Sequence, residues 1–124
     1  MRLKLFAVAA VLTACSGPIY EPASPQGDPP SRQRIEENIP NVFAPSANPR
    51  DILVSAVRPA VEQGLFVWLV CVRARVTAAD GRDAGFVTIA VFFQRQEMVL
   101  RRSAEPKDKC EGFEKPNAKV TTAN

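Results

Sequence analysis

The residues that could carry chemistry in this chain are three cysteines and a set of arginines, and there is no histidine among the 124 residues. Histidine is the commonest general base and the commonest ligand of transition metals, so its absence removes both roles. Ser55, Ser103 and Thr88 therefore have no imidazole that could activate their hydroxyl groups. We expect no catalytic residue, no metal site and no cofactor, and hence a protein that is not an enzyme.

Paired acids do not change this expectation. Glu36–Glu37 lies in a Pro-rich segment and Asp80–Asp83 in a turn, whereas glycosidase chemistry needs two carboxylates on rigid elements across a cleft. We interpret both pairs as solvated loop charges.

Four arginines are the candidate binding residues. Arg73 and Arg75 alternate along one predicted strand, and Arg101 and Arg102 follow on another. If these strands are close, the guanidinium groups would form a patch for lipid A phosphates, anionic glycans or the carboxylates of a partner. The alternative is a water-facing side of the sheet with interspersed charge.

Net charge gives no argument for nucleic acid as a partner. The chain has 16 Lys and Arg against 13 Asp and Glu, a formal charge of +3. Without Arg2 and Lys4, 14 basic residues face 13 acidic ones, which leaves +1. A nearly neutral chain lacks the basic surface that binds phosphate backbones.

The start of the chain has the pattern of an export signal. A basic segment, residues 1–4, is followed by ten mostly apolar residues, 5–14, which is too short for a membrane-spanning helix of about 20 residues. The run ends in Leu12-Thr13-Ala14-Cys15, which resembles the lipobox of bacterial lipoprotein precursors.

That resemblance implies a signal peptide of residues 1–14, cleavage before Cys15 by signal peptidase II, and a lipid on the Cys15 thiol. Two or more acyl chains would anchor the protein stably in a membrane. Ser16 resembles the class sorted to the outer membrane, so we expect a lipid-anchored envelope protein, on the outer membrane and facing the periplasm. The alternative is an ordinary secretory signal with a coincidental cysteine.

Residues 15–49 are predicted to be a Pro-rich tether, since proline excludes long helices and central strands. Residues 31–38 could form one or two helical turns with Ser31 as N-cap. Ile39, Val42 and Phe43 could then dock onto the folded head. Plain disorder is the equal alternative.

Residues 50–113 are predicted to fold as a small, mainly β domain, with a small α+β fold as the variant. Period-two alternation and β-branched runs predict strands at 51–57, 65–76, 86–93 and 97–101. Asp80-Gly81 marks the turn of a central hairpin. The result is a short antiparallel meander of three or four strands, with aromatic residues mostly in its core, followed by a flexible tail, 114–124.

Cys71 and Cys110 remain for a disulfide. An export signal implies an oxidising compartment, and closing a loop of about 40 residues would stabilise the fold by roughly 4 kcal/mol. Two free thiols are the alternative.

The head resembles small uncharacterised lipoproteins of alphaproteobacteria, through Leu69-Val70-Cys71-Val72-Arg73, the strand pair and Cys110. The resemblance implies no activity.

These observations favour a non-enzymatic accessory or structural module that is held on the membrane by Cys15 and binds another envelope component. An alternative is an inhibitor of a lytic enzyme such as lysozyme, with Asp80 to Asp83 as the inhibitory loop. A third hypothesis is the binding of an anionic lipid or glycan by the arginines. The oligomeric state stays open.

Overall fold

The computed structural model describes residues 27–117. One antiparallel sheet dominates it, and its five strands are β1 (Arg50–Val54), β2 (Arg58–Glu62), β3 (Leu65–Thr77), β4 (Asp83–Gln94) and β5 (Glu97–Ser103). A short helix, α2 (Arg32–Asn38), and two 3₁₀ turns (Ile39–Asn41 and Pro45–Ala47) precede the sheet, and a third 3₁₀ turn, η3 (Pro106–Asp108), follows it. Within this part of the chain, no helix is long and apolar enough to cross a membrane.

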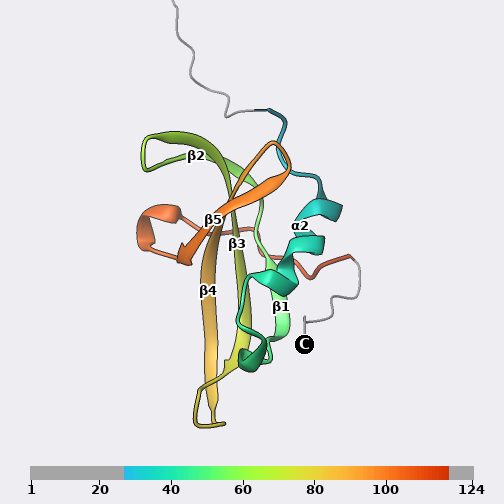
Figure 1. Cartoon of the computed structure of the whole chain (residues 1–124), viewed down its shortest axis with the longest axis vertical. Helices are drawn as coiled ribbons and strands as arrows, with labels where there is room; N and C mark the ends of the chain where they lie inside the picture. The colour runs from blue at the N-terminus through green and yellow to red at the C-terminus, as the bar shows by residue number, and fades with distance from the viewer. Residues whose placement is uncertain (1–26, 118–124) are drawn as a thin grey trace, which may run out of the picture.

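The strand order is β1-β3-β4-β5, and β2 also pairs with β3. Both β1 and β2 lie along the same edge of β3, β2 opposite its first residues and β1 opposite its last ones. Figure 1 shows β3 and β4 as the long central pair. The predicted antiparallel meander is confirmed, and it has five strands where three or four were expected.

β2 is the strand that the sequence analysis did not predict. It contains Pro59, which lies opposite Trp68 in β3. Proline is tolerated here because an edge strand has a hydrogen-bonding neighbour on one side only.

Side-chain alternation in β3 gives the sheet two apolar faces. On the helix face, Val70, Val72, Ala74 and Val76 pack with side chains of the segment before the sheet; the buried members of that segment are Ile35, Ile39, Val42 and Phe43. The other face, here called the tail face, carries Val67, Leu69, Cys71, Ala90 and Phe92 and is partly covered by Cys110 and Phe113.

The packed part of the described chain begins before residue 50 and includes α2. Ser31 caps this helix by accepting a hydrogen bond from the Arg34 N–H at 3.1 Å. Ile35 and Ile39 are 3% and 1% exposed, so the helix supplies apolar cover that the sheet needs. The alternative of a helix that docks onto the head is confirmed for this segment, and the predicted tether residues before 27 lie outside the described part.

The start of the tail, at residue 114, contacts the sheet. Glu114 pairs with Val54 of β1 through two backbone hydrogen bonds of 2.8 and 2.9 Å. The Asn117 N–H donates to a Glu36 carboxylate oxygen at 2.6 Å. The tail thus extends the sheet edge and reaches α2; residues 118–124 lie outside the described part.

The connection between β4 and β5 is a two-residue turn without glycine. Arg95 and Gln96 both have positive φ, 50° and 72°, the conformation that a tight hairpin requires. Interactions of Gln96 with the preceding segment hold the turn: its side chain accepts from the Ser31 N–H at 3.0 Å and donates to the Pro29 carbonyl at 2.8 Å. The same contacts hold the start of the described chain at the end of the sheet where the β4–β5 turn lies.

Candidate functional site

The disulfide between Cys71 and Cys110 is present, with the two Cα atoms 5.8 Å apart. It joins the centre of β3 to the tail, 39 residues further along the chain. The bond therefore holds the tail over Leu69, Phe92 and their neighbours on the tail face. Of the two alternatives, the disulfide is confirmed over the free thiols.

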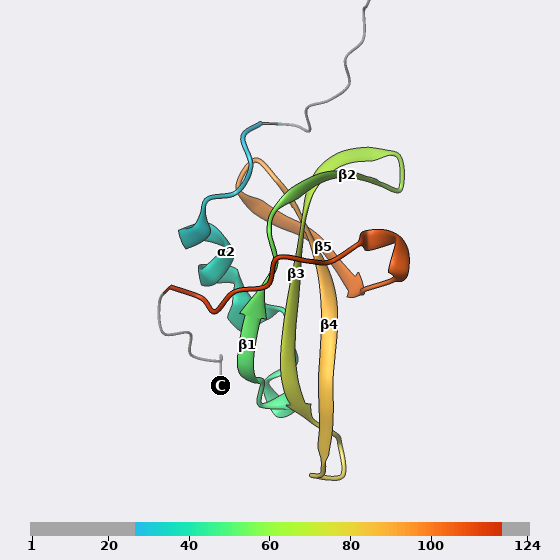
Figure 2. The same cartoon turned by 180° about the vertical axis from the view of Figure 1, so that it is seen from behind.

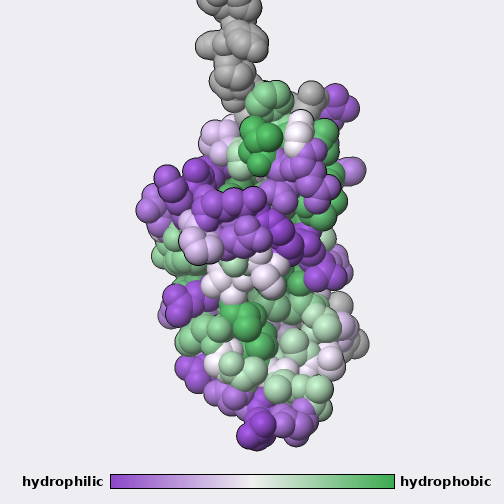
Figure 3. Space-filling model, turned by 90° about the vertical axis from the view of Figure 1, so that its left-hand side faces the viewer, coloured by the Kyte–Doolittle hydropathy of each residue, from purple (hydrophilic) through white to green (hydrophobic). Residues whose placement is uncertain are grey.

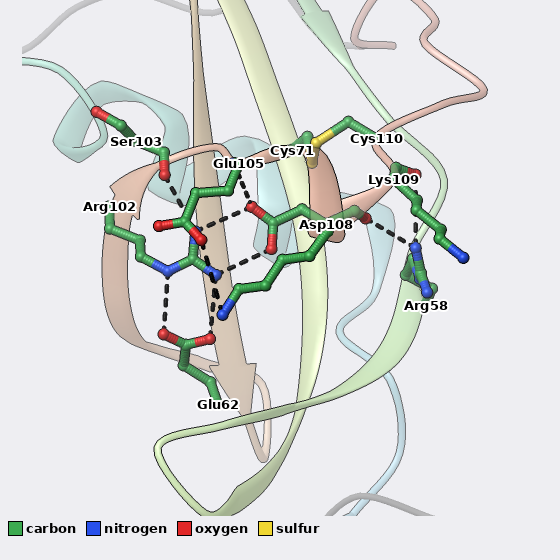
Figure 4. A network of polar contacts seen from close by, with 10 residues as sticks. Arg58, Glu62, Cys71, Arg102, Ser103, Glu105, Asp108, Lys109 and Cys110 are labelled. Carbon is green, nitrogen blue, oxygen red and sulfur yellow. Dashed lines mark hydrogen bonds and ion pairs between the residues drawn. A yellow bond between two sulfur atoms is a disulfide. The ribbon is translucent and has the colours of Figure 1, made fainter.

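Arg102 lies at the centre of a closed ion cluster on the tail face (Figure 4). Its guanidinium donates to both carboxylate oxygens of Glu62, at 3.0 and 3.0 Å, and to both of Asp108, at 2.9 and 2.9 Å. It also lies 5.1 Å from the centre of the Phe92 ring. The side chain of Asp108 is 4% exposed and that of Glu62 is 11% exposed.

Electrostatics stabilise this cluster in its charged form. The hydrogen bonds from Arg102 lower the pKa of Glu62 and of Asp108, although burial opposes the effect. The same two carboxylates, Asp108 first, raise the pKa of Arg102 above its usual value. Asp108 also accepts from the Glu105 N–H at 2.7 Å, which caps the η3 turn. A fifth guanidinium N–H of Arg102 donates to the Ser103 carbonyl oxygen at 3.0 Å. All five N–H donors of Arg102 are therefore occupied within the fold, and none is left for a partner.

Arg101 points to the opposite face. Its guanidinium donates to the Val42 carbonyl oxygen at 3.1 Å, beside the helical segment. Successive residues of a strand face opposite sides of the sheet, so Arg101 and Arg102 cannot join one patch. The four arginines predicted as anionic-partner contacts are therefore not brought together.

Arg73 and Arg75 do form a shared site, around an aromatic ring that the sequence analysis assigned to the core. Their guanidinium carbons lie 4.7 and 4.9 Å from the centre of the Phe86 ring. Phe86 is 40% exposed and stands opposite Arg75 in the β3–β4 ladder. The sequence could have predicted this neighbourhood, because a hairpin that turns at Asp80-Gly81 has a register in which Phe86 lies opposite Arg75. We call Arg73, Arg75 and Phe86 the cation–aromatic site.

The two arginines of this site differ in how much of their charge is balanced. Arg75 pairs with Asp83 at 3.2 Å and lies 3.6 Å from an oxygen of Asp51. Arg73 is exposed and contacts the Phe86 ring, and within residues 27–117 it has no ion pair. The pKa of Asp83 is lowered, first by the Gly85 N–H and then by Arg75. Arg73 thus carries the charge that is available to an anion.

A groove of about 530 Å³ lies beside this site. Phe86 forms one wall of it, and the remaining lining residues come from the start of β1 and from the tail: Pro49, Arg50, Asp51, Ile52, Leu53, Lys115 and Pro116. The charged residues of this lining are two cations, Arg50 and Lys115, and one acid, Asp51. Apolar side chains beside an excess of cations suit a ligand that joins an acidic group to an apolar or planar one.

One of the three hydroxyl residues considered above, Ser55, has a structural role. Ser55 is 3% exposed; its oxygen accepts from the Cys71 N–H at 2.7 Å and donates to the Ala56 carbonyl at 3.0 Å. No group of three potential metal ligands occurs among the described residues. Cys15, the predicted lipid site, lies outside the described part of the chain.

No family model, no curated protein and no solved structure matches this chain.

Proposed function

We propose that the protein is a lipid-anchored, non-enzymatic binding module of the bacterial cell envelope, which contacts an anionic envelope component through its cation–aromatic site. The anchor is the lipid on Cys15. The resemblance of Ser16 to the class sorted to the outer membrane favours that membrane, with the head in the periplasm. The lipobox resemblance supports the anchor. The folded head supplies the binding surface.

One observation carries the binding role. Arg101 and Arg102 are bonded to other parts of the fold, whereas Arg73 is exposed beside a ring that is itself 40% exposed. A guanidinium stacked on an aromatic ring is already oriented and partly desolvated, so less entropy is lost when it forms bidentate bonds to a carboxylate or phosphate. Partner surfaces are enriched in aromatic residues and arginine for this reason.

Photocrosslinking in cells tests the proposal. A photoreactive amino acid replaces Phe86 in one strain and Val99 in another, since Val99 is exposed to a similar extent, 48%, on β5. We expect a specific crosslinked component from position 86, its loss in the Arg73→Gln background, and its loss in the Cys15→Ala variant, which lacks the anchor. Equal capture from both positions, or capture that Arg73→Gln leaves unchanged, would refute the binding role.

Mass spectrometry of the mature protein tests the anchor separately. A chain that begins at Cys15 and carries the mass of its acyl chains is the expected result. A chain cleaved elsewhere, or without added mass, would refute it.

The second candidate, inhibition of a lytic enzyme, has one observation in its favour. The β3–β4 hairpin continues to the Thr77–Asp83 pair, beyond the last pairs that β1 and β5 make, so its turn projects from the sheet (Figure 1). Within the turn, however, Asp80 pairs with Arg82 at 2.8 Å. Lysis assays with saturating protein decide the matter: undiminished lysozyme activity would remove this function.

A further inference from the structure

The hairpin of β2 and β3 ends in an apolar tip formed by Val61, Leu65 and Phe66. These side chains are 60%, 53% and 46% exposed. Val61 lies opposite Phe66, and Leu65 lies opposite Glu62. Leu65 and Phe66 are consecutive and so face opposite sides of the hairpin. The tip is therefore apolar on both sides, which is unfavourable in water.

The apolar tip projects beyond the rest of the sheet. The outermost pair between β3 and β4 is Trp68–Phe93, whereas the pairing of β2 with β3 continues to Glu62–Leu65. The tip thus has no neighbouring strand on its β4 side. Figure 1 shows this hairpin curving away from the body of the molecule.

The described chain begins at the same end of the sheet. The Gly27 carbonyl accepts a hydrogen bond from the Trp68 indole at 3.3 Å. The Gln94 side chain, next to the β4–β5 turn, donates to the Phe66 carbonyl at 3.2 Å. Figures 1 and 2 both place the hairpin and the start of the described chain at one end of the molecule.

The length of chain before Gly27 sets how far this end can lie from the anchor. Cys15 precedes Gly27 by 12 residues, and a chain of that length spans at most about 40 Å when fully extended. A membrane that held a lipid on Cys15 would therefore be within reach of this end of the head.

Basic residues lie alongside the β2–β3 hairpin, between its base and the apolar tip. Arg102 bonds both Glu62 in the hairpin and Asp108 in η3, which places Lys107 and Lys109 beside the hairpin. Both lysines are exposed, and Lys107 also lies 3.7 Å from a carboxylate oxygen of the exposed Glu105. Figure 3 shows apolar residues, with some hydrophilic ones among them, at the end where the described chain begins, and a band of hydrophilic residues across the molecule below it. An apolar end with adjacent cations is the arrangement of a surface that binds an anionic lipid bilayer.

We propose that the apolar tip enters the outer part of the bilayer that holds the lipid on Cys15, with Lys107 and Lys109 at the level of the headgroups. This inference rests on the anchoring in the proposed function. It orients the head, because the cation–aromatic site and the Asp80 turn then face away from the membrane.

Depth-dependent fluorescence quenching tests the orientation in the full mature chain. Trp68 is the one tryptophan of the protein, so Trp68→Phe gives a background without indole. Phe66→Trp is then compared with Phe86→Trp, a matched control since Phe86 is similarly exposed, 40% against 46%, on the other half of the sheet. Each acylated protein is reconstituted into vesicles of phosphatidylethanolamine and phosphatidylglycerol with brominated acyl chains. Circular dichroism confirms that both variants are folded.

The expected result is at least twofold stronger quenching for Phe66→Trp than for Phe86→Trp, and its loss when Val61→Ser and Leu65→Ser are added. If the protein floats with the vesicles but the two tryptophans are quenched equally, or not at all, the inference is overturned and the anchor stays intact. A tip that is covered by a second copy of the chain would give this same result. If the mature chain carries no lipid and does not float, both the anchor and the inference fail.

Discussion

Each half of the tail face has an arginine that lies over a phenylalanine ring, but the arginine is enclosed in one half and exposed in the other. In the half near the β2–β3 hairpin, Arg102 lies over Phe92, and two carboxylates and the disulfide-linked tail enclose it. In the half near the β3–β4 turn, Arg73 lies over Phe86 and stays exposed. An arginine on an aromatic ring is a structural element where acids from other segments reach it, and a candidate binding element where they do not.

Breaking the disulfide should have the largest effect on this contrast. Replacing Cys71 and Cys110 by serine together should lower the free energy of unfolding by roughly 4 kcal/mol, because the loop of about 40 residues is no longer closed in the unfolded chain. Urea denaturation followed by circular dichroism measures this. A change under about 1 kcal/mol would contradict this stabilising role of the bond.

Removing Arg102 should have the next largest effect. Arg102→Ala leaves Glu62 and the nearly buried Asp108 without a counter-charge, and we expect a loss of about 3 kcal/mol in the free energy of unfolding. Arg102→Lys keeps the charge and loses the paired hydrogen bonds, so it should fall between the wild type and the alanine variant. If both variants unfold at the wild-type urea concentration, the cluster contributes nothing to stability.

The ion cluster should also make stability depend on pH. Arg102 lowers the pKa of Glu62 and Asp108 in the folded protein below their ordinary values of 4.5 and 3.8. The two carboxylates therefore bind protons more readily in the unfolded chain than in the folded protein. The contribution of the cluster to stability is complete above about pH 5, and it is lost as the pH falls through the ordinary pKa values toward the lower pKa values of the folded protein. Urea unfolding at several pH values should show a steeper acid loss in the wild type than in Arg102→Ala; parallel profiles would contradict this.

Changes in the cation–aromatic site should have the smallest effect on stability. Arg73→Gln should alter the free energy of unfolding by less than about 0.5 kcal/mol, and Phe86→Ala by about 1 kcal/mol through the lost ring contacts. Both should nonetheless abolish crosslinking from this half of the sheet, probed from a photoreactive group at Thr88 on the same face. Thermal unfolding and crosslinking of the same variants would separate a binding role from a structural one.

The sequence predicted the central strands and the disulfide because these depend on local patterns. β3 and β4 are long β-branched runs joined by Asp80-Gly81, and Cys71 and Cys110 remain as a pair once Cys15 is assigned to lipid. β2 was missed because Pro59 argues against a strand unless the edge of β3 is already known. α2 was left open because it follows a Pro-rich segment, and its burial depends on the apolar helix face of the sheet.

The fate of the arginines could not be predicted, since it depends on residues that are distant in the sequence. Glu62 comes from 40 residues before Arg102, and Asp108 reaches it only because the tail turns back over the sheet. The separation of Arg101 from Arg102, in contrast, follows from strand alternation and could have been predicted.

Arginine reactivity measured in purified protein and in native membranes tests the contrast most directly. Phenylglyoxal modifies accessible guanidinium groups, and mass spectrometry of peptides reports each site. Arg102 should stay unmodified in both samples, whereas Arg73 should react in the purified protein and be protected several-fold in membranes, where its partner is present. Equal reactivity of Arg73 and Arg102, or equal reactivity of Arg73 in both samples, would contradict the account.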